Sequence, residues 1–325
     1  MVLGHRKGVQ WVGVIPLRQD RLRRRISFLE EQRSQRQDAL IAPEMAPELY
    51  WRRLGEYFLE RRDWDRLDLA FLREASAETI LQQWPRLGMA VRERGRVRQR
   101  RIQLQRPWAE IEAGVSLELR ANLRRRLKRL RTQGELKLCV YQQPAELQPA
   151  LRECFELEAQ GWKGATGTAI LSHGAQRRFF RQMAYRLAAA EQFRLYGLRL
   201  EGKLIAFEYC AAGGRRLHSL KIAYDEHLRA LSPGQVLRLM LLEAAQSEFD
   251  DYEFMGDDAN WKADWTDEVH ELVHLRVYNR TWGGWARLWR ARGYAAWRSA
   301  RQRWRPARRL QPVGGAVTLR GGMES

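Results

Sequence analysis

Three strand-like segments that follow one another almost without interruption constrain the fold of this chain more than any other feature. They are residues 193–200 (FRLYGLRL), 203–213 (KLIAFEYCAAG) and 216–225 (RLHSLKIAYD). The connecting pairs Glu201-Gly202 and Gly213-Gly214 suit tight turns, because glycine adopts positive φ without strain. Connections this short join antiparallel neighbours, so the segments predict an antiparallel meander.

The elements around this meander predict an α/β domain with a mixed sheet. A half-buried strand and two helices precede the meander, and a helix and two further strands follow it. In chain order they are strand 135–142, helices 144–162 and 174–192, helix 232–246, and strands 251–257 and 271–279. A glycine-rich loop, GWKGATGT at 161–168, separates the first two helices. Strands that alternate with helices in this way are typical of a sheet flanked by helices.

The first hundred residues show the same alternation on a smaller scale. The patterns predict strands at 9–17, 25–29 and 67–72, helices at 46–60 and 76–86, the latter with Ser76 as N-cap, and a strand-like link at 100–107. A long helix from Leu117 to Thr132 leads into the larger domain. We therefore expect an N-terminal unit at 1–107, a domain at 108–280, a basic helix at 281–310 and a flexible tail at 311–325.

The net charge of +19 is concentrated in two places. Residues 120–131 (RANLRRRLKRLR) hold seven basic residues and no acid, and residues 280–310 hold ten arginines and no acid. The remainder is close to neutral. The composition therefore describes a neutral protein with two cationic elements, and it excludes a uniformly basic, histone-like binder.

Composition sets further limits on the class of protein. With 45% hydrophobic residues the chain can form a packed core, and no apolar run approaches the ~18 residues of a transmembrane helix. The N-terminus does not read as a secretory signal, and three cysteines without metal-type spacing favour a reducing compartment, so we expect a cytoplasmic protein. His270 and His274 fall in a strand pattern rather than on a zinc-binding helix. The sequence contains no nucleophile elbow, no Walker loop and no dinucleotide fingerprint.

Five short motifs follow one another between residues 120 and 265. They are Arg120-x-Asn122-x-Arg124-Arg125 with Gly134, Glu158-x-x-Gly161-Trp162-Lys163-Gly164 with Gly167-Thr168-Ala169, Lys221-x-x-Tyr224-Asp225, Ser232-Pro233-Gly234, and Asp257-x-x-x-Trp261-Lys262 with Trp265. In this order they resemble the GNAT superfamily of acyltransferases, in its FemAB-like and CelD-like branch. The CelD-like members are acetyltransferase domains of cellulose-biosynthesis proteins. The resemblance covers residues 100–280 strongly and the first hundred residues weakly.

The resemblance implies a fold, a reaction and a co-substrate. The implied fold is α/β (α+β), a GNAT-like mixed twisted sheet flanked by helices, with two GNAT-like halves as in FemAB-like proteins. The first half is expected to be incomplete, because the family usually has more sequence before the strand at 9–17. The implied reaction transfers an acetyl or other acyl group from acyl-CoA to an amine, without a metal. The acceptor class is a sugar, an amino acid or an envelope-polysaccharide precursor.

The expected acyl-CoA site is the start of the helix at 232–246. Ser232 is a good N-cap, Pro233 suits the first helical turn, and Gly234 permits a close backbone approach. Free N–H groups and the positive end of the helix dipole attract a pyrophosphate there. An ordinary capped helix shows the same local pattern, and only the resemblance favours the acyl-CoA site. The residues expected to bind the co-substrate are Lys221, Ser232, Pro233, Gly234, Gln235, Val236 and Leu237.

Four residues are candidates for proton transfer: Glu158, Tyr224, Asp225 and Asp257. An amine must be neutral when it attacks a thioester, and a carboxylate can serve as the base. Tyr224 would protonate the leaving thiolate. Strand alternation places Asp225 on the face opposite Tyr224, so the two act on one atom only if the strand bends. The sequence does not choose among the three carboxylates, and each also fits a structural role.

Four further residues are candidates for acceptor binding: Trp162, Lys163, Trp261 and Lys262. Loops on a rigid scaffold commonly carry a site, and lysine can bind a carboxylate or a phosphate. Trp162 would equally fill the core. Trp261 and Trp265 are four residues apart, which fits a core-facing helix more simply than a platform for a sugar.

The two cationic elements are either solvated faces or interaction surfaces. Residues 120–131 place leucines on one helix face and arginines on the other, as a solvated helix or a nucleic-acid contact would. Residues 284–305 interleave tryptophan and arginine, which fits either an anchor on an anionic membrane, at its inner face, or tryptophans docked on the domain. The alternative to an enzyme is therefore a non-catalytic basic adaptor of GNAT-like fold. For the enzyme we expect a small-molecule amine as partner and no nucleic acid.

Overall fold

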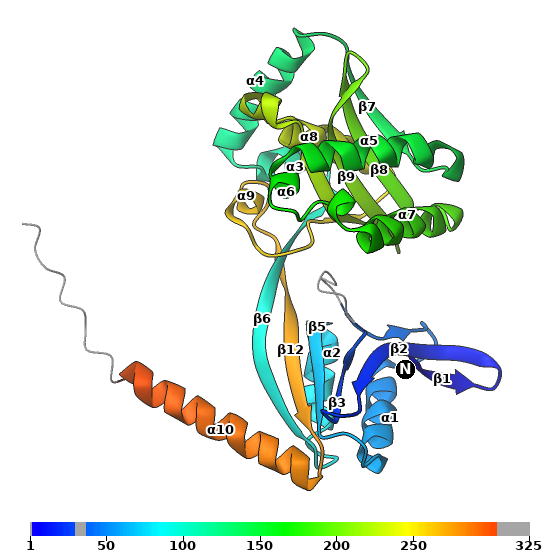
Figure 1. Ribbon diagram of the computed structural model, residues 1–325, viewed down its shortest axis with the longest axis vertical. Coiled ribbons are helices and arrows are strands. Elements are labelled where there is room, and N and C mark those ends of the chain that lie inside the picture. Colours follow the sequence, from blue (N-terminus) through cyan, green and yellow to red (C-terminus); the bar gives the residue numbers. More distant parts are fainter. Residues whose placement is uncertain (1, 30–36, 304–325) are drawn as a thin grey trace, which may run out of the picture.

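The computed structural model describes residues 2–29 and 37–303, with the backbone alone at residue 292 and from 294 onward. The chain forms two lobes, one above the other in Figure 1, and two long strands run between them. These strands are β6 (Ala90–Gln103) and β12 (Val269–Tyr278), which pair antiparallel. β6 also pairs with β11 of the upper lobe, so both lobes share one continuous sheet.

The sheet has twelve strands in the described part of the chain, in the order β1-β2-β3-β5-β12-β6-β11-β10-β9-β8-β7, with β4 beside β2. The remaining strands of the N-terminal lobe are β1 (Val2–Lys7), β2 (Gln10–Asp20), β3 (Arg25–Phe28), β4 (Leu40–Ile41) and β5 (Arg66–Arg73). Those of the C-terminal lobe are β7 (Leu136–Tyr141), β8 (Phe193–Leu200), β9 (Lys203–Gly213), β10 (Arg216–Tyr224) and β11 (Asp251–Glu253). Two parallel pairs, β3–β5 and β10–β11, make this the mixed sheet that the sequence predicts.

The predicted meander is confirmed as β8, β9 and β10, which pair antiparallel in sequence order. Gly202 and Gly214 lie in its turns with φ of +77° and +55°. Residues with a side chain adopt such angles only with strain, so these glycines explain why the segments reverse so tightly.

Helices cover both faces of the sheet in the C-terminal lobe. On one face α5 (Leu147–Gln160) and α7 (Gly174–Ala189) pack around buried side chains that include Phe193 and Tyr209. On the other face lie α4 (Leu117–Arg131) and α8 (Pro233–Ala245).

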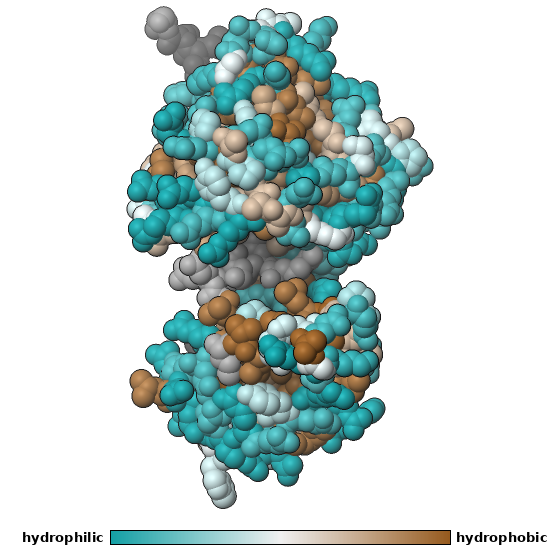
Figure 2. All heavy atoms as spheres, turned by 90° about the vertical axis from the view of Figure 1, so that its right-hand side faces the viewer, coloured by the Kyte–Doolittle hydropathy of each residue, from teal (hydrophilic) through white to brown (hydrophobic). Residues whose placement is uncertain are grey.

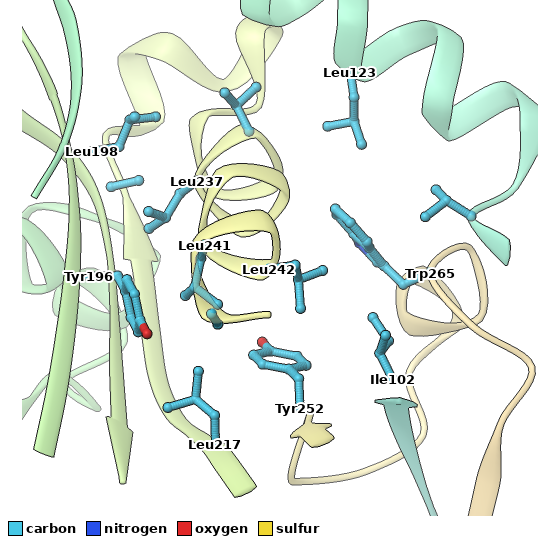
Figure 3. Close-up of a cluster of buried hydrophobic side chains, with 14 of the residues drawn as sticks. Ile102, Leu123, Tyr196, Leu198, Leu217, Leu237, Leu241, Leu242, Tyr252 and Trp265 are labelled. Carbon is cyan, nitrogen blue, oxygen red and sulfur yellow. The ribbon is translucent and has the colours of Figure 1, made fainter. Parts of the chain in front are cut away.

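The core beneath α8 fixes this helix against the sheet. Figure 3 shows Leu237 and Leu241 of α8 facing Leu198 and Tyr196 of the sheet. Trp265 and Tyr252 lie in the same cluster and are fully buried. Each such side chain contributes about 1.5–3 kcal/mol by burial, so the start of α8 is held by a rigid support.

The N-terminal lobe has a separate core built around tryptophan. α1 (Pro47–Glu60) and α2 (Glu74–Gln83) pack on its strands. Trp51, Trp64 and Trp84 are fully buried. The indole N–H of Trp84 donates to the Trp51 carbonyl at 2.9 Å, which satisfies a buried donor and joins the two helices.

Short helices complete the described chain. They are α3 (Trp108–Gly114), η1 (Pro144–Glu146), α6 (Trp162–Ala165), η2 (Ile170–Ser172), η3 (Glu226–Leu231) and α9 (Asn260–Ala263), followed by the longer α10 (Trp282–Arg303). Within the described ranges, none of the helices combines the length and the apolar character needed to cross a bilayer.

Most predicted elements are confirmed, and the differences have physical causes. Of the expected strand-like link at 100–107, only residues 100–103 are strand; they are the end of β6, a strand of fourteen residues whose arginines hid its periodicity. β1 was not predicted. Ser76 is not an N-cap, because α2 begins at Glu74 and the Ser76 hydroxyl donates instead to Asp38 at 3.0 Å. The predicted tail at 311–325 lies outside the described residues, and the boundaries at 107 and 280 stay predictions.

Candidate active site

The candidate site lies where β10 separates from its parallel neighbour β11. The two strands pair only over 216–218 and 251–253, although β10 continues to Tyr224. A cavity of about 460 Å³ opens beside the rest of β10. Its walls are the end of α5 with the loop that follows, β9 and β10, the first residue of η3, the start of α8, and Trp261.

A buried ion pair forms one wall of the cavity. Glu158, near the end of α5, accepts a hydrogen bond from Lys163 Nζ at 3.0 Å and another from the Ile170 N–H at 2.8 Å. Lys163 Nζ also donates to the Ile222 carbonyl of β10 at 2.8 Å. Lys163 therefore ties the loop after α5 to the edge of β10 that β11 leaves unpaired. At Gly164 a Cβ atom would overlap the Ala159 carbonyl oxygen, which explains a glycine there.

Glu226 is a second carboxylate on the cavity wall. Its Oε1 accepts a hydrogen bond from the Trp162 N–H at 2.7 Å. Gly161 allows this close approach, because a Cβ atom there would lie 2.8 Å from the same oxygen. Within the described part of the chain, no lysine, arginine or histidine forms an ion pair with Glu226. Glu226 thus differs from Glu158 and Glu208, which form ion pairs with Lys163 and Arg238.

A second buried ion pair borders the cavity on the α8 side. Arg238 Nη2 donates to Glu208 at 3.0 Å, and Arg238 Nε donates to the Tyr252 hydroxyl at 3.0 Å. The Tyr252 hydroxyl in turn donates to Glu208. All three residues are almost completely buried. The guanidinium also lies 4.7 Å from the centre of the Trp261 ring, a cation–π distance.

The charges in this cluster reinforce one another. Burial alone would lower the pKa of Arg238, but Tyr252 and Glu208 raise it above its usual value. Burial raises the pKa of the Tyr252 hydroxyl well above its usual range. Arg238 therefore stays charged and Tyr252 stays a neutral donor at all ordinary pH values.

The start of α8 borders the cavity through three of its residues. Ser232 adopts the left-handed conformation with φ of +44° and precedes Pro233 at the first helical position. At Gly234 a Cβ atom would lie 3.5 Å from the Tyr224 ring, which is ordinary van der Waals contact, so the position has room for a small side chain beside that ring. Gln235 accepts a hydrogen bond from the Trp265 indole at 2.7 Å, which joins α8 to the segment after α9.

The structure brings eight of the predicted site residues together around the cavity. They are Glu158, Trp162, Lys163, Tyr224, Ser232, Gly234, Gln235 and Trp261. Pro233 adjoins them, and Val236 and Leu237 lie one turn further in, where they belong to the hydrophobic core.

Four further predicted residues do not line the cavity. Asp225 is buried and caps η3, with one oxygen on the His227 N–H at 3.0 Å and the other on Lys203 Nζ at 2.8 Å. Lys221 lies over the Phe180 ring, 5.1 Å from its centre.

The other two of these four belong to the loop after β11. Asp257 is exposed, and Lys262 is buried and donates to the Met255 and Asp257 carbonyls. Lys262 thus stabilises the loop between β11 and α9. The chemical roles assigned to these four residues stay predictions.

Three charged residues of the cavity were missed by the sequence analysis: Glu208, Glu226 and Arg238. Glu208 and Arg238 stand alone among apolar neighbours, in LIAFEYC and in VLRLM, and a charge inside an apolar run indicates a buried pair. Glu226 follows Asp225 at the end of a strand, where the sequence offers no such contrast.

Comparison with known proteins agrees with this geometry. Residues 118–263 match the family model of the acetyltransferase (GNAT) domain. This segment includes every element that lines the cavity. Residues 118–263 therefore resemble a GNAT-type acetyltransferase domain, and this likeness supports acyl transfer in general.

Solved structures share the fold over most of the chain. The C-terminal domain of a putative lysylphosphatidylglycerol synthetase from Agrobacterium fabrum is 15% identical, with a TM-score of 0.54 over 85% of this chain and 84% of that one. FemX is 10% identical, with a TM-score of 0.55 over 85% and 87%. L-PGS from Bacillus licheniformis is 13% identical, with a TM-score of 0.53 over 83% and 82%. Identities this low show the fold alone. None of the curated proteins matches the chain.

Proposed function

We propose that this protein is an acyl-CoA-dependent N-acyltransferase that transfers an acetyl or other acyl group to an amine. The acceptor would be a sugar, an amino acid or an envelope-polysaccharide precursor, as in the CelD-like and FemAB-like branch that the motifs resemble. The observation that carries the proposal is the cavity between the unpaired edge of β10 and the start of α8. Its position is where the resemblance expects the acyl-CoA thioester.

The proposed acyl-CoA position follows from the two sides of this cavity. The pyrophosphate would lie at the N-terminus of α8, where the dipole favours negative charge and Gly234 leaves space. The pantetheine arm would run along the edge of β10 that β11 leaves unpaired. The thioester would then lie between Tyr224 and the wall formed by Glu158 and Lys163.

The proposed reaction is a direct attack of the amine on the thioester carbonyl. The new C–N bond forms, the C–S bond breaks, and the CoA thiolate leaves with a proton from Tyr224. The proton lost by the amine goes to a carboxylate. Of the three carboxylates singled out in the sequence, only Glu158 lines the cavity, so we assign it this role. Glu226 also lines the cavity and is the competing assignment.

Binding of acetyl-CoA, measured by calorimetry, tests this proposal. Gly234→Trp would fill the space beside Tyr224 and should abolish binding that is micromolar in the wild type. Gly174→Trp is the matched control, because Gly174 also begins a helix, does not line the cavity, and a Cβ atom there would meet only the Arg178 side chain, at 4.0 Å. A well-folded wild type that binds neither acetyl-CoA nor longer acyl-CoAs in low salt would contradict the enzyme and favour the basic adaptor.

A further inference from the structure

The surface of the N-terminal lobe where α10 begins exposes apolar side chains among arginines. Leu22, in the β2–β3 turn, is 99% exposed, and Arg21 and Arg23 beside it are exposed too. On α10, Trp282 is 94% and Trp289 65% exposed, and Arg290 is exposed beside them. We call this surface the tryptophan–arginine surface; it comprises Arg21, Leu22, Arg23, Trp282, Trp289 and Arg290.

Hydrogen bonds hold the turn and the helix side by side. Arg287 of α10 donates to the Arg23 carbonyl at 3.1 Å. Asp65, which is buried, receives Arg24 Nε at 3.0 Å and the Thr281 hydroxyl at 2.7 Å. The Thr281 hydroxyl also accepts the Gly284 N–H at 3.0 Å and so caps the helix. The two parts of the surface are therefore fixed to the same rigid base.

The described tryptophans of α10 differ in how far they are exposed. Leu288 is buried, so one face of the first turns packs on the lobe. Trp282, Trp285 and Trp289 follow at helical spacings of three and four, share another face, and are all exposed. Figure 1 shows α10 leaving the lobe after its first turns. The sequence left open whether these rings dock on the domain. Trp282 is almost fully exposed, whereas Trp285 is about half exposed and lies beside Tyr278 and Asn279 of the lobe.

We propose that the tryptophan–arginine surface binds an anionic lipid bilayer. Tryptophan and leucine insert at the boundary between headgroups and acyl chains, while arginines beside them contact anionic headgroups. Residues 280–310 contain ten arginines and no acid, so their charge complements such a membrane. The β2–β3 turn offers nucleic acid no aromatic ring on which an unpaired base could stack, because its tip is the aliphatic Leu22. Self-association through this surface is disfavoured, because the arginines of two copies would repel each other.

Co-sedimentation of the full chain with vesicles tests this proposal. We expect binding to vesicles of phosphatidylcholine with one third phosphatidylglycerol, and little binding to pure phosphatidylcholine. The affinity should fall as salt is raised, because the arginine contacts are screened. Equal binding to both vesicle types would overturn the proposal.

Matched variants separate this surface from general basicity. Leu22→Ser combined with Trp282→Ala should weaken binding to the anionic vesicles about tenfold or more. Leu40→Ser combined with Trp11→Ala makes the same chemical changes at exposed residues elsewhere and should leave binding unchanged. The proposal is overturned if both pairs behave alike, or if Arg125→Gln with Arg129→Gln on α4 removes binding instead.

Two further outcomes of the same experiment would favour other partners. The proposal fails if the wild type is a dimer without lipid and the Trp282 and Leu22 changes make it a monomer. It also fails if these changes weaken binding to a single-stranded RNA but not to vesicles. Neither outcome bears on acetyl-CoA binding, because this surface and the cavity are formed by different residues.

Discussion

Arg238 is the buried charge on which the α8 wall of the cavity depends. Removing it leaves Glu208 and the Tyr252 hydroxyl buried without their partner. We expect Arg238→Met to lower the free energy of unfolding by about 3–5 kcal/mol, measured by urea denaturation. Adding Glu208→Leu should restore part of that loss, because no unpaired charge then remains. If the double variant is less stable than Arg238→Met alone, the two side chains do not stabilise the fold as a pair.

Tyr224 lines the cavity, and none of the hydrogen bonds in the described part of the chain involves its hydroxyl. If it protonates the leaving thiolate, Tyr224→Phe should lower kcat about 100-fold and change the dissociation constant of acetyl-CoA less than twofold. Tyr57→Phe, on exposed α1 surface, is the control and should change neither. An equal loss in binding and turnover would instead make Tyr224 a binding residue.

At the residue scale, the motifs located the cavity but not its charge pairing. Glu158, Lys163 and Tyr224 stand next to glycine-rich or strand-end patterns, and the structure places all three at the cavity. Asp225 also ends a strand, yet its backbone position turns it toward Lys203 and the start of η3. The direction in which a carboxylate at a turn points depends on tertiary contacts. The local sequence pattern does not contain this information.

At the element scale, η3 links β10 to α8, and Asp225 caps its start. Burial alone would raise the pKa of the Asp225 carboxyl, but hydrogen bonds from Lys203 and the His227 N–H hold that pKa below its usual value. A carboxyl whose pKa is lower in the folded state stabilises the fold above its unfolded pKa of about 3.9. This stabilisation is lost as the pH falls through the folded pKa.

Asp225→Asn tests this linkage, because asparagine keeps an acceptor for the cap and removes the charge. We expect the difference in unfolding free energy between wild type and variant to be largest near pH 6 and to shrink below about pH 4. Urea unfolding across this range measures it. A difference that is constant with pH would contradict the charge-based account.

Helices and strands with a regular apolar periodicity were predicted correctly, and those without one were not. The helices at α1 and α4 and the strands of the meander follow clean apolar patterns and are confirmed. The sequence pattern does not reveal β6 as a strand, because arginine occupies its alternate positions. The aliphatic parts of these arginine side chains, and ion pairs such as Arg100 with Asp258, take the place of apolar packing. Ser76 was misread because its hydroxyl is used by a residue distant in sequence.

The whole molecule consists of two lobes with separate cores that share the β6–β12 ladder (Figure 2 shows the waist between them).

Leu69→Ala in the N-terminal core should lower the free energy of unfolding by about 2–5 kcal/mol. It should change the acetyl-CoA affinity less than twofold, because the described residues that line the cavity all lie within 157–261. Leu241→Ala, equally buried beneath α8, should lower both stability and affinity. Thermal unfolding measures the stability of each variant, and calorimetry measures its acetyl-CoA affinity. Equal losses of affinity in the two variants would contradict the view that the two cores are independent.

The order of the sequence motifs predicted a mixed sheet, and the structure confirms it. The sequence did not predict that β12 pairs with β5 of the N-terminal lobe. Pairing between strands some 200 residues apart depends on which edges remain free after the lobes form, and a single sequence does not reveal this.

Hydrogen exchange with and without saturating acetyl-CoA tests the central claim most directly, namely that the cavity between β10 and α8 holds the co-substrate. The account predicts slower exchange in residues 161–165, 220–226 and 232–238, and no change in α1 or β1. No change anywhere, or slower exchange confined to segments outside the cavity, would contradict it.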